Sequence, residues 1–164
     1  MTQTWSLLGP NELSHVVDIA AVVHPGFFEA ADVLAEKQAL YPQGARLLRL
    51  DGVPSGYILS HPWAANAIPA LNAPLGAIPP DADSYYLHDL ALLPSARGTG
   101  AAGAIVADIL AHARGAGFGV ASLVAVNGSI GFWRRQGFAV NEVPALLDKL
   151  AGYEPAARFM TRPL

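Results

Sequence analysis

The chain has 164 residues, of which 52% are hydrophobic and 14% charged, with a formal net charge of −3 and no cysteine. This composition excludes a disordered chain, a basic nucleic-acid-binding surface, disulfides, thiolate metal ligands and a cysteine nucleophile. No apolar run reaches the ~18 residues that a membrane span needs, so we expect a single cytoplasmic domain over residues 1–164. The high apolar content leaves room for a homodimer.

The first half of the chain predicts two helices between short strands. In chain order we expect a strand near 5–8, helices over 11–23 and 29–40, and a hairpin of strands at 46–50 and 56–60 around the turn 51–54. Apolar residues recur at helical spacing in the first helix, which Asn11 could cap. Glu29, Asp32 and Glu36 define a polar face of the second helix.

A long segment from His61 to Asp83 follows the hairpin. It contains five prolines and no usable period, which predicts a loop. Long ordered loops often close over a functional site, whereas a proline-rich stretch can also be a plain connector. The sequence leaves both interpretations open.

The second half alternates strands and helices around a β-α-β unit. In chain order we expect a strand at 84–92, a glycine turn at 97–100, a helix ended by Gly115 and Gly117, a buried strand at 120–126, a helix over 129–136, a strand start at 138–140 and an edge strand at 157–161. Ile105 with Ile109, and Val106 with Leu110 and Ala113, form the apolar stripe of the first of these helices. We therefore expect an α/β fold with a mixed sheet.

The turn between the 84–92 strand and this helix carries the clearest chemical signal. It reads Pro94-Ser95-Ala96-Arg97-Gly98-Thr99-Gly100-Ala101-Ala102. Two glycines let backbone N–H groups point outward, and the positive end of the helix dipole favours an anion beside them. Arg97 adds one positive charge. The turn therefore predicts a phosphate-binding site.

The same turn also matches a dinucleotide-binding pattern, because Gly98 to Gly103 read G-x-G-x-x-G. Such a site needs an acidic residue at the end of the next strand. Here that strand ends at Val126-Asn127, and only 37 residues follow, which is too few for the rest of a dinucleotide-binding sheet. No Gly-Lys-Ser/Thr follows either, as a P-loop would require. A phosphate site remains, whereas NAD and ATP are excluded.

Two ordered motifs resemble those of the GNAT superfamily of N-acetyltransferases. Arg97-x-x-Gly100-x-Ala102 is similar to the family's acetyl-coenzyme A signature, and Asn127 followed by Phe132-Trp133-x-x-x-Gly137-Phe138 is similar to a second family motif. The resemblance covers Tyr85 to Phe138. It implies an α/β fold with a mostly antiparallel sheet of six to seven strands, a central β-α-β core and flanking helices, with acetyl-coenzyme A (acetyl-CoA) as cosubstrate and no metal.

The resemblance also implies roles for individual residues. The pyrophosphate of coenzyme A would be held by five backbone N–H groups, those of Gly98, Thr99, Gly100, Ala101 and Ala102. Arg97 would assist, the pantetheine arm would pair with the main chain of Leu90 and Leu92, and Asn127 would contact the same arm. Trp133 stands where many family members carry a tyrosine that protonates the departing thiolate. An indole N–H cannot supply that proton, so Trp133 would line the thioester pocket or simply belong to the core.

His88 is the candidate general base. An ammonium substrate must lose a proton before its nitrogen can attack, and histidine titrates near neutral pH. His88 matches a catalytic histidine of the arylalkylamine N-acetyltransferase branch. Strand alternation places it on one face with Tyr86 and Leu90, and places Asp89, a weaker candidate, on the other face. The alternative is a structural histidine.

The remaining histidines show no metal-ligand spacing. They are His15, His24, His61 and His112. We therefore expect no metal site and assign these side chains to surface or capping positions.

The sequence favours an N-acetyltransferase that acts on the primary amine of a small molecule or a peptide. The alternative is a coenzyme A-binding sensor or structural protein that has lost catalysis, because the tyrosine is missing at Trp133. Neither a nucleic acid nor a membrane is an expected partner.

Overall fold

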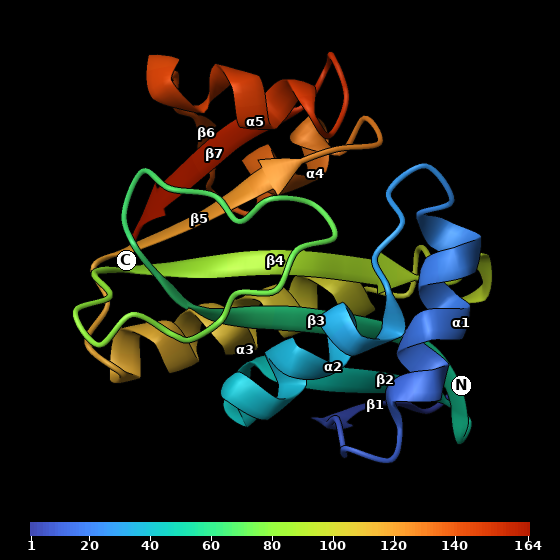
Figure 1. The fold of residues 1–164 in the computed structure, drawn as a ribbon. Helices are drawn as coiled ribbons and strands as arrows, with labels where there is room; N and C mark the ends of the chain where they lie inside the picture. Colours follow the sequence, from blue (N-terminus) through green and yellow to red (C-terminus); the bar gives the residue numbers. More distant parts are fainter.

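A seven-stranded sheet forms the centre of the molecule, as the computed structural model of residues 1–164 shows (Figure 1). The strands are β1 Gln3–Leu7, β2 Ala45–Leu50, β3 Val53–Trp63, β4 Ser84–Leu92, β5 Val120–Ala125, β6 Ala139–Val140 and β7 Arg158–Pro163. They lie in the order β1-β2-β3-β4-β5-β7-β6, and only β4 and β5 are parallel neighbours. The predicted α/β fold with a mostly antiparallel sheet of six to seven strands is confirmed.

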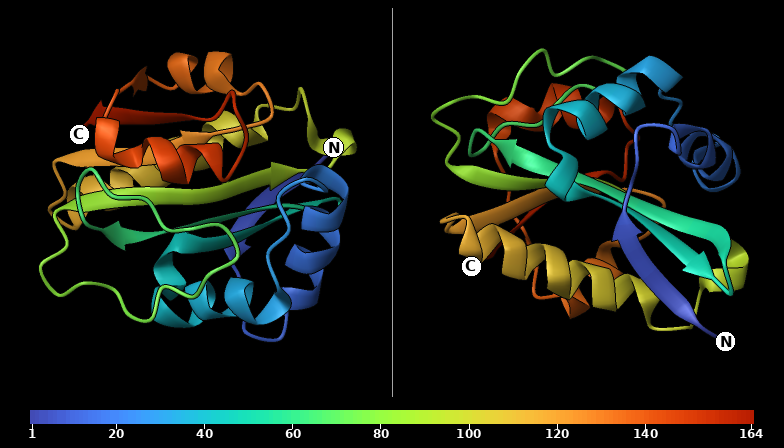
Figure 2. Two further views of the ribbon diagram at one scale, coloured as in Figure 1. Left: turned by 45° about the horizontal axis from the view of Figure 1, so that its top comes forward. Right: turned by 90° about the horizontal axis from the view of Figure 1, so that it is seen from below.

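Helices cover both faces of this sheet (Figure 2). The five α-helices are α1 Leu13–Val23, α2 Ala31–Leu40, α3 Ala101–Gly115, α4 Ile130–Arg135 and α5 Leu147–Ala151. Residues of α1 and α2 pack with Tyr57 and Ala91 on one face, whereas α3 packs with Tyr85 and Leu87 on the other. None of the helices is long and apolar enough to cross a membrane.

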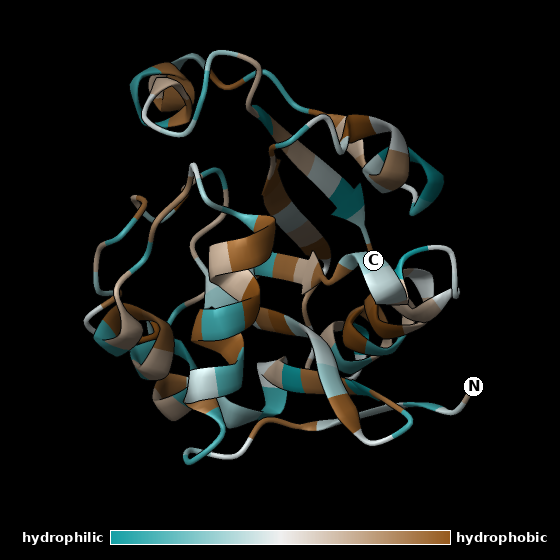
Figure 3. Cartoon of the chain, turned by 90° about the vertical axis from the view of Figure 1, so that its right-hand side faces the viewer, coloured by the Kyte–Doolittle hydropathy of each residue, from teal (hydrophilic) through white to brown (hydrophobic).

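The apolar stripe predicted for α3 packs in the largest core cluster. Its five residues are each at most 2% exposed and contact side chains of β4 and β5. Figure 3 shows apolar and polar residues alternating along the helices. Full burial of one such side chain contributes about 1.5–3 kcal/mol. This packing fixes the first turn of α3, and with it the glycine turn, beside the end of β4.

The parallel strands β4 and β5 pair over only part of their length. Their register runs from Tyr85 opposite Ala121 to Leu87 opposite Leu123. Beyond that point β4 continues to Leu92 and β5 continues to Ala125 without pairing to each other. The sheet therefore contains a gap that opens toward the glycine turn.

A β-bulge at His88 changes the faces that alternation predicts for β4. Leu59 lies opposite Asp89 and Ser60 opposite Leu87, so His88 is the additional residue of the bulge. Because a bulge inserts one residue, side chains beyond it change face. Leu90 packs on the α3 side, and Asp89 contacts Tyr57 and the end of α1. The prediction that Asp89 faces away from His88, and that Leu90 shares the face of His88, is therefore wrong.

Several element boundaries also differ from the sequence-based expectation. Strand β7 lies between β5 and β6, so the edge strand is the two-residue β6 and not the C-terminal segment. The short helix α5 has no counterpart in the prediction. Helix α1 begins at Leu13, and Asn11 does not cap it, because Glu12 occupies the N-cap position without a side-chain cap. Glu12 instead accepts the N–H of Gly9 at 3.0 Å.

The proline-rich loop is shorter than predicted, because β3 continues to Trp63 and leaves residues 64–83 as loop. The loop runs across the face that carries α1 and α2 (Figure 1). Glu36 of α2 accepts two backbone N–H groups from it, at 2.6 and 3.0 Å. The Tyr153 hydroxyl donates to the carbonyl of Pro69 at 2.9 Å. These hydrogen bonds hold the loop beside the gap between β4 and β5.

Candidate active site

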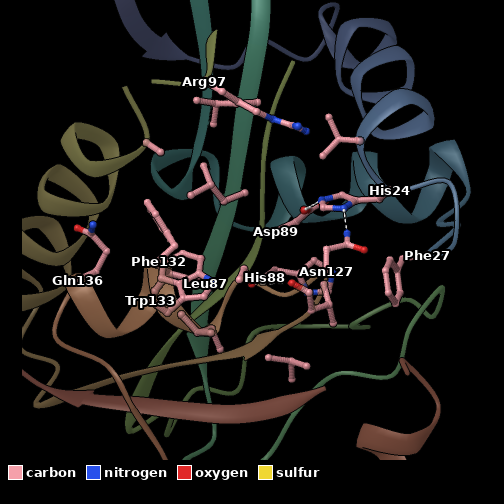
Figure 4. A pocket seen from close by; sticks show the side chains of 18 of the residues that line it. His24, Phe27, Leu87, His88, Asp89, Arg97, Asn127, Phe132, Trp133 and Gln136 are labelled. Atoms are coloured by element: carbon pink, nitrogen blue, oxygen red, sulfur yellow. Dashed lines mark hydrogen bonds and ion pairs between the residues drawn. The ribbon is translucent and has the colours of Figure 1, made fainter. Parts of the chain in front are cut away.

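One large cavity of about 780 Å³ extends from the glycine turn to the connection between α1 and α2. Figure 4 shows Arg97 at one end of this pocket, with Phe132 and Trp133 on one side and His24 and Asn127 on the facing side. The cavity brings together ten of the eleven predicted site residues, namely His88, Leu90, Leu92, Arg97, Gly98, Gly100, Ala101, Ala102, Asn127 and Trp133. Thr99 does not line it.

The glycine turn has the geometry that phosphate binding needs. Gly98 and Gly100 have φ angles of 76° and 83°, in the left-handed region that favours glycine. Gly100 is the N-cap of α3 and offers no side-chain cap. The backbone N–H groups of Gly98, Gly100, Ala102 and Gly103 donate to no protein acceptor. Free donors at a helix N-terminus form a ready anion site.

Two residues of the turn differ in what they can offer an anion. Arg97 is exposed and makes no ion pair, so its guanidinium is free at the mouth of the pocket. The Thr99 hydroxyl donates to the carbonyl of Ala96 at 2.6 Å and accepts the N–H of Ala101 at 3.3 Å. Thr99 therefore stabilises the turn from inside. Only its backbone remains a candidate for the phosphate contact predicted from the sequence.

Trp133 belongs both to the core and to the pocket wall, so the two alternatives left by the sequence are compatible. The residue is 7% exposed and packs edge-to-face against Phe132 and Phe138, at 4.9 and 5.6 Å between ring centres. Its position on α4 places it on the side of the gap opposite His24 (Figure 4). An aromatic wall of this kind can cover an apolar arm lying in the gap.

His88 is paired with a carboxylate that the sequence did not connect to it. Nε2 of His88 lies 3.0 Å from Oε1 of Glu29, and the two side chains are 2% and 7% exposed. Glu29 was expected on a polar face of the second helix, but it precedes α2 and turns into the pocket. Since a carboxylate can only accept, Nε2 carries the hydrogen. Nδ1 of His88 is buried without a partner, which leaves its lone pair free.

Glu29 is held in its ionised form by its surroundings. Burial raises the pKa of Glu29, but the hydrogen bond from His88, the charge that His88 carries when protonated and the charge of Lys37 outweigh burial and lower it overall. The Lys37 ammonium is itself 2% exposed and lies 3.9 Å from the other Glu29 oxygen. Burial lowers the pKa of Lys37, and the nearby carboxylates oppose that effect. This buried charge cluster could not be predicted from the sequence, because both residues occur in an ordinary polar helix pattern.

A second histidine–carboxylate pair lines the same pocket. His24 donates through Nε2 to Oδ1 of Asp89 at 2.8 Å, and the amide of Asn127 lies 3.1 Å from Nδ1 of His24. The Tyr57 hydroxyl donates to the other oxygen of Asp89. The His24 and Asp89 side chains are 14% and 13% exposed. His24 also ends α1, as a capping position should, but the assignment to a surface or capping role missed its place in the pocket.

His61 was also assigned to a surface or capping position, and this is wrong because His61 lies within β3 and is 0% exposed. Nδ1 of His61 lies 2.9 Å from the carbonyl of Pro62, and Nε2 has no partner. Burial lowers the pKa of His61 to about 3, and the charge of His88 acts in the same direction. Its ring centre lies 5.9 Å from that of His88. His61 is therefore a neutral wall behind the candidate base.

The fold and the pocket together define an α/β protein in which a glycine turn with free backbone N–H groups lies beside a split pair of parallel strands. The sequence over residues 15–138 matches the profile of the acetyltransferase (GNAT) family. This match spans well over half of the chain, so the protein belongs to the GNAT acetyltransferase family, an acyltransferase family. No curated protein sequence matches the chain.

Solved structures with the same fold match nearly the whole chain. The loading GNATL domain of CurA from Lyngbya majuscula has a TM-score of 0.82 at 11% identity and covers 99% of this chain and 98% of that one. The PaiA N-acetyltransferase from Thermoplasma acidophilum, in complex with coenzyme A, has a TM-score of 0.71 at 12% identity, with 100% of both chains covered. The NatC complex bound to Gag peptide and CoA has a TM-score of 0.72 at 14% identity, and the match covers 100% of this chain and 99% of that one.

Proposed function

We propose that this protein, acting as a single catalytic domain over residues 1–164, transfers an acetyl group from acetyl-CoA to a primary amine. The observation that carries the proposal is the continuity of one cavity from the free N–H groups of the glycine turn to the buried pair of His88 and Glu29. A phosphate-binding end and a proton-accepting end in one cavity fit a cosubstrate that bears phosphates at one end and a thioester at the other.

The cosubstrate end is built mainly from backbone groups. The N–H groups of Gly98, Gly100 and Ala102 would hold the pyrophosphate, and Arg97 would add charge at the rim. The arm would lie in the gap, where the main chain of β4 beyond Leu87 has no partner in β5. Acetyl-CoA supplies the activated acetyl group as a thioester. The protein supplies position, exclusion of water and proton transfer.

His88 would accept the proton of the substrate ammonium at Nδ1, directly or through one water, once a small movement of the ring or its neighbours exposes this buried atom to the pocket. Glu29 holds Nε2–H, so Nδ1 is the only basic atom of the ring. The ion pair would then stabilise the imidazolium, as the carboxylate does in other histidine–carboxylate pairs. His88 is then the general base predicted from the sequence, and Glu29 is the residue that positions it.

The acceptor end of the pocket suits a substrate that carries an apolar group next to its amine. Val23, Phe27 and Leu71 provide apolar surface there. The carboxylates of Glu29 and Asp89 lie on the same lining and would attract an ammonium group. A primary amine on a small molecule or at the start of a peptide has these features. The similar NatC complex is bound to a peptide together with CoA, which supports testing peptides as acceptors.

The proposal is tested by measuring release of free thiol from acetyl-CoA with a panel of small amines and short peptides. Binding of acetyl-CoA is measured in parallel by calorimetry. We expect binding without any amine and thiol release only with a suitable amine. Binding with no thiol release across the panel would favour the coenzyme A sensor. Absence of binding would reject both functions.

A further inference from the structure

The proposed acetyl transfer needs a proton donor for the departing thiolate, and Trp133 cannot be that donor. The indole N–H does not ionise in the relevant range. The inference below rests on the proposed function and concerns the group that supplies this proton. The donor has to line the cavity near the gap between β4 and β5.

Most polar side chains on the lining are already committed or unsuitable. The Ser129 hydroxyl donates to the carbonyl of Val126 at 2.6 Å. The Tyr153 hydroxyl donates to Pro69, and burial raises the pKa of Tyr153. His88 donates through Nε2 to Glu29 and serves as the base. Arginine side chains do not release a proton. His24 remains.

His24 contacts residues on both sides of the gap between β4 and β5. It contacts Asp89 on β4 and Asn127 just after β5, so its ring bridges the two separated strands (Figure 4). The strands rejoin at Leu87 and Leu123, which limits how far an arm can extend along the gap. The reactive end of the arm must therefore lie beside His88 and Asp89, within reach of the His24 ring.

We propose that His24, held by Asp89, is the general acid that protonates the departing thiolate of coenzyme A. Asp89 accepts from Nε2, so the transferable proton is the one on Nδ1. In the structure the amide nitrogen Nδ2 of Asn127 lies 3.1 Å from Nδ1 of His24, which suits an unprotonated Nδ1. When Nδ1 carries a proton, a flip of the side-chain amide presents its oxygen as the acceptor. In the complex, the sulfur replaces this amide as the partner of Nδ1–H.

The surroundings of His24 favour its protonated form. Burial lowers the pKa of His24, but the hydrogen bond and charge of Asp89, assisted by Glu29, outweigh burial and raise it overall. The charged or titratable groups around the His24–Asp89 pair are Glu29 ahead of α2, Lys37 of α2 and three tyrosines, Tyr57, Tyr86 and Tyr153. Behind Asn127, Glu154 accepts the backbone N–H at 2.9 Å. A raised pKa keeps more of His24 charged near neutral pH.

The proton transfers balance over one catalytic cycle. His88 takes one proton from the ammonium, the amine nitrogen then forms the C–N bond, and the C–S bond breaks with its electron pair on sulfur. His24 gives its Nδ1 proton to that sulfur, which leaves as the thiol. The amide nitrogen loses its second proton, which recharges His24 through water. His88 releases its proton to solvent, so both rings return to their starting states.

The experiment measures the thiol pKa of bound coenzyme A, without an amine and without turnover. Thiolate absorbance in the ultraviolet is followed against pH for coenzyme A bound to wild type, to His24→Gln and to Asp89→Asn. A neighbouring imidazolium lowers a thiol pKa from its usual ~8.5. We expect the thiol pKa of coenzyme A bound to wild type to lie at least ~1 unit below the value in His24→Gln. The value in Asp89→Asn should lie between the two. His15→Gln, on α1 outside the pocket, is the matched control.

Kinetics provide the second readout. In His24→Gln we expect kcat to fall by about 10²- to 10⁴-fold, with unchanged affinity for acetyl-CoA, and the alkaline limb of the kcat profile to disappear. Identical thiol titrations in wild type and both variants would overturn the role of His24 while leaving acetyl transfer intact. If wild type binds no coenzyme A, the proposed function itself is wrong and this role falls with it. Should His24→Gln not fold, Asp89→Asn decides alone, and an unshifted thiol overturns the proposal.

Discussion

Glu29 and His88 form a buried hydrogen bond of 3.0 Å although they lie 59 positions apart in the chain. The contact fixes which nitrogen of His88 carries hydrogen, and it leaves Nδ1 as the buried atom without a partner. An oriented imidazole with one free lone pair is what general-base catalysis requires. The contact with Glu29 therefore makes His88 a candidate general base whose role can be tested by mutation.

Replacing His88 with glutamine should remove the acidic limb of the kcat/KM profile and lower the rate by about 10²- to 10⁴-fold. The affinity for acetyl-CoA should barely change, because backbone groups of the glycine turn and Arg97 lie at the other end of the cavity. The measurement uses one amine for wild type and variant, since the amine titrates as well.

Glu29→Gln is the companion variant for this pair. It keeps the shape of Glu29 but removes the charge that stabilises the imidazolium. We expect a lower kcat with unchanged acetyl-CoA affinity, and a smaller loss than in His88→Gln. If both variants keep the wild-type rate and pH profile, the proton leaves by another route, and Tyr86 or bulk water would have to be considered.

Gly100→Glu should abolish acetyl-CoA binding. A Cβ at this position meets no atom within 4 Å, so the side chain would enter open space beside the free N–H groups. A carboxylate there would occupy or repel the anion site. The positive φ of 83° adds backbone strain of about 1–2 kcal/mol.

Gly100→Ala separates strain from charge in this test, because alanine carries the same backbone cost without the carboxylate. Calorimetry with acetyl-CoA should show a moderate loss for alanine and no binding for glutamate, with both proteins folded by circular dichroism. Wild-type affinity in Gly100→Glu would reject the phosphate role of the turn.

Trp133→Tyr should keep or raise turnover, because it supplies a hydroxyl where the indole has none. The smaller ring leaves space against Phe132 and Phe138, so the free energy of unfolding should fall by about 1–2 kcal/mol. In the His24→Gln background, the same change should restore part of the lost rate, since a tyrosine hydroxyl can protonate the thiolate. Turnover of Trp133→Tyr below that of Trp133→Ala would contradict this placement.

Acid should destabilise the protein partly through His61. Burial lowers the pKa of His61 to about 3. Between pH ~6.5 and about 3, His61 is therefore protonated in the unfolded chain and neutral in the folded protein. The unfolded state then binds more protons, and the free energy of unfolding falls as the pH falls, by about 1.4 kcal/mol per pH unit for this one group.

His61→Phe removes this contribution while keeping a ring of similar size. The variant should lose about 1 kcal/mol at pH 7 with its hydrogen bond to Pro62, but its stability should depend less on pH. Urea unfolding at several pH values between 7 and 4 measures both slopes. Equal slopes for wild type and His61→Phe would show that His61 titrates normally.

The sequence determined the features of this protein that depend on residues close together in the chain. The stripe of α3 follows from apolar spacing, because a helix repeats every 3.6 residues. The glycines at positions 98 and 100 predict a turn with positive φ angles, and both residues adopt such angles in the structure. The same local patterns carried the resemblance to the GNAT family, which the family match over residues 15–138 confirms.

The tertiary structure decided which side chains face one another in the pocket. The bulge at His88 arises from the register between β3 and β4, and it turns Asp89 toward the end of α1. Contacts such as His24 with Asp89, 65 residues apart, leave no periodic trace in either segment. A strand pattern specifies only alternation, whereas one inserted residue moves every later side chain to the other face. The roles proposed for Glu29 and His24 therefore became visible only in the packed arrangement of strands and helices.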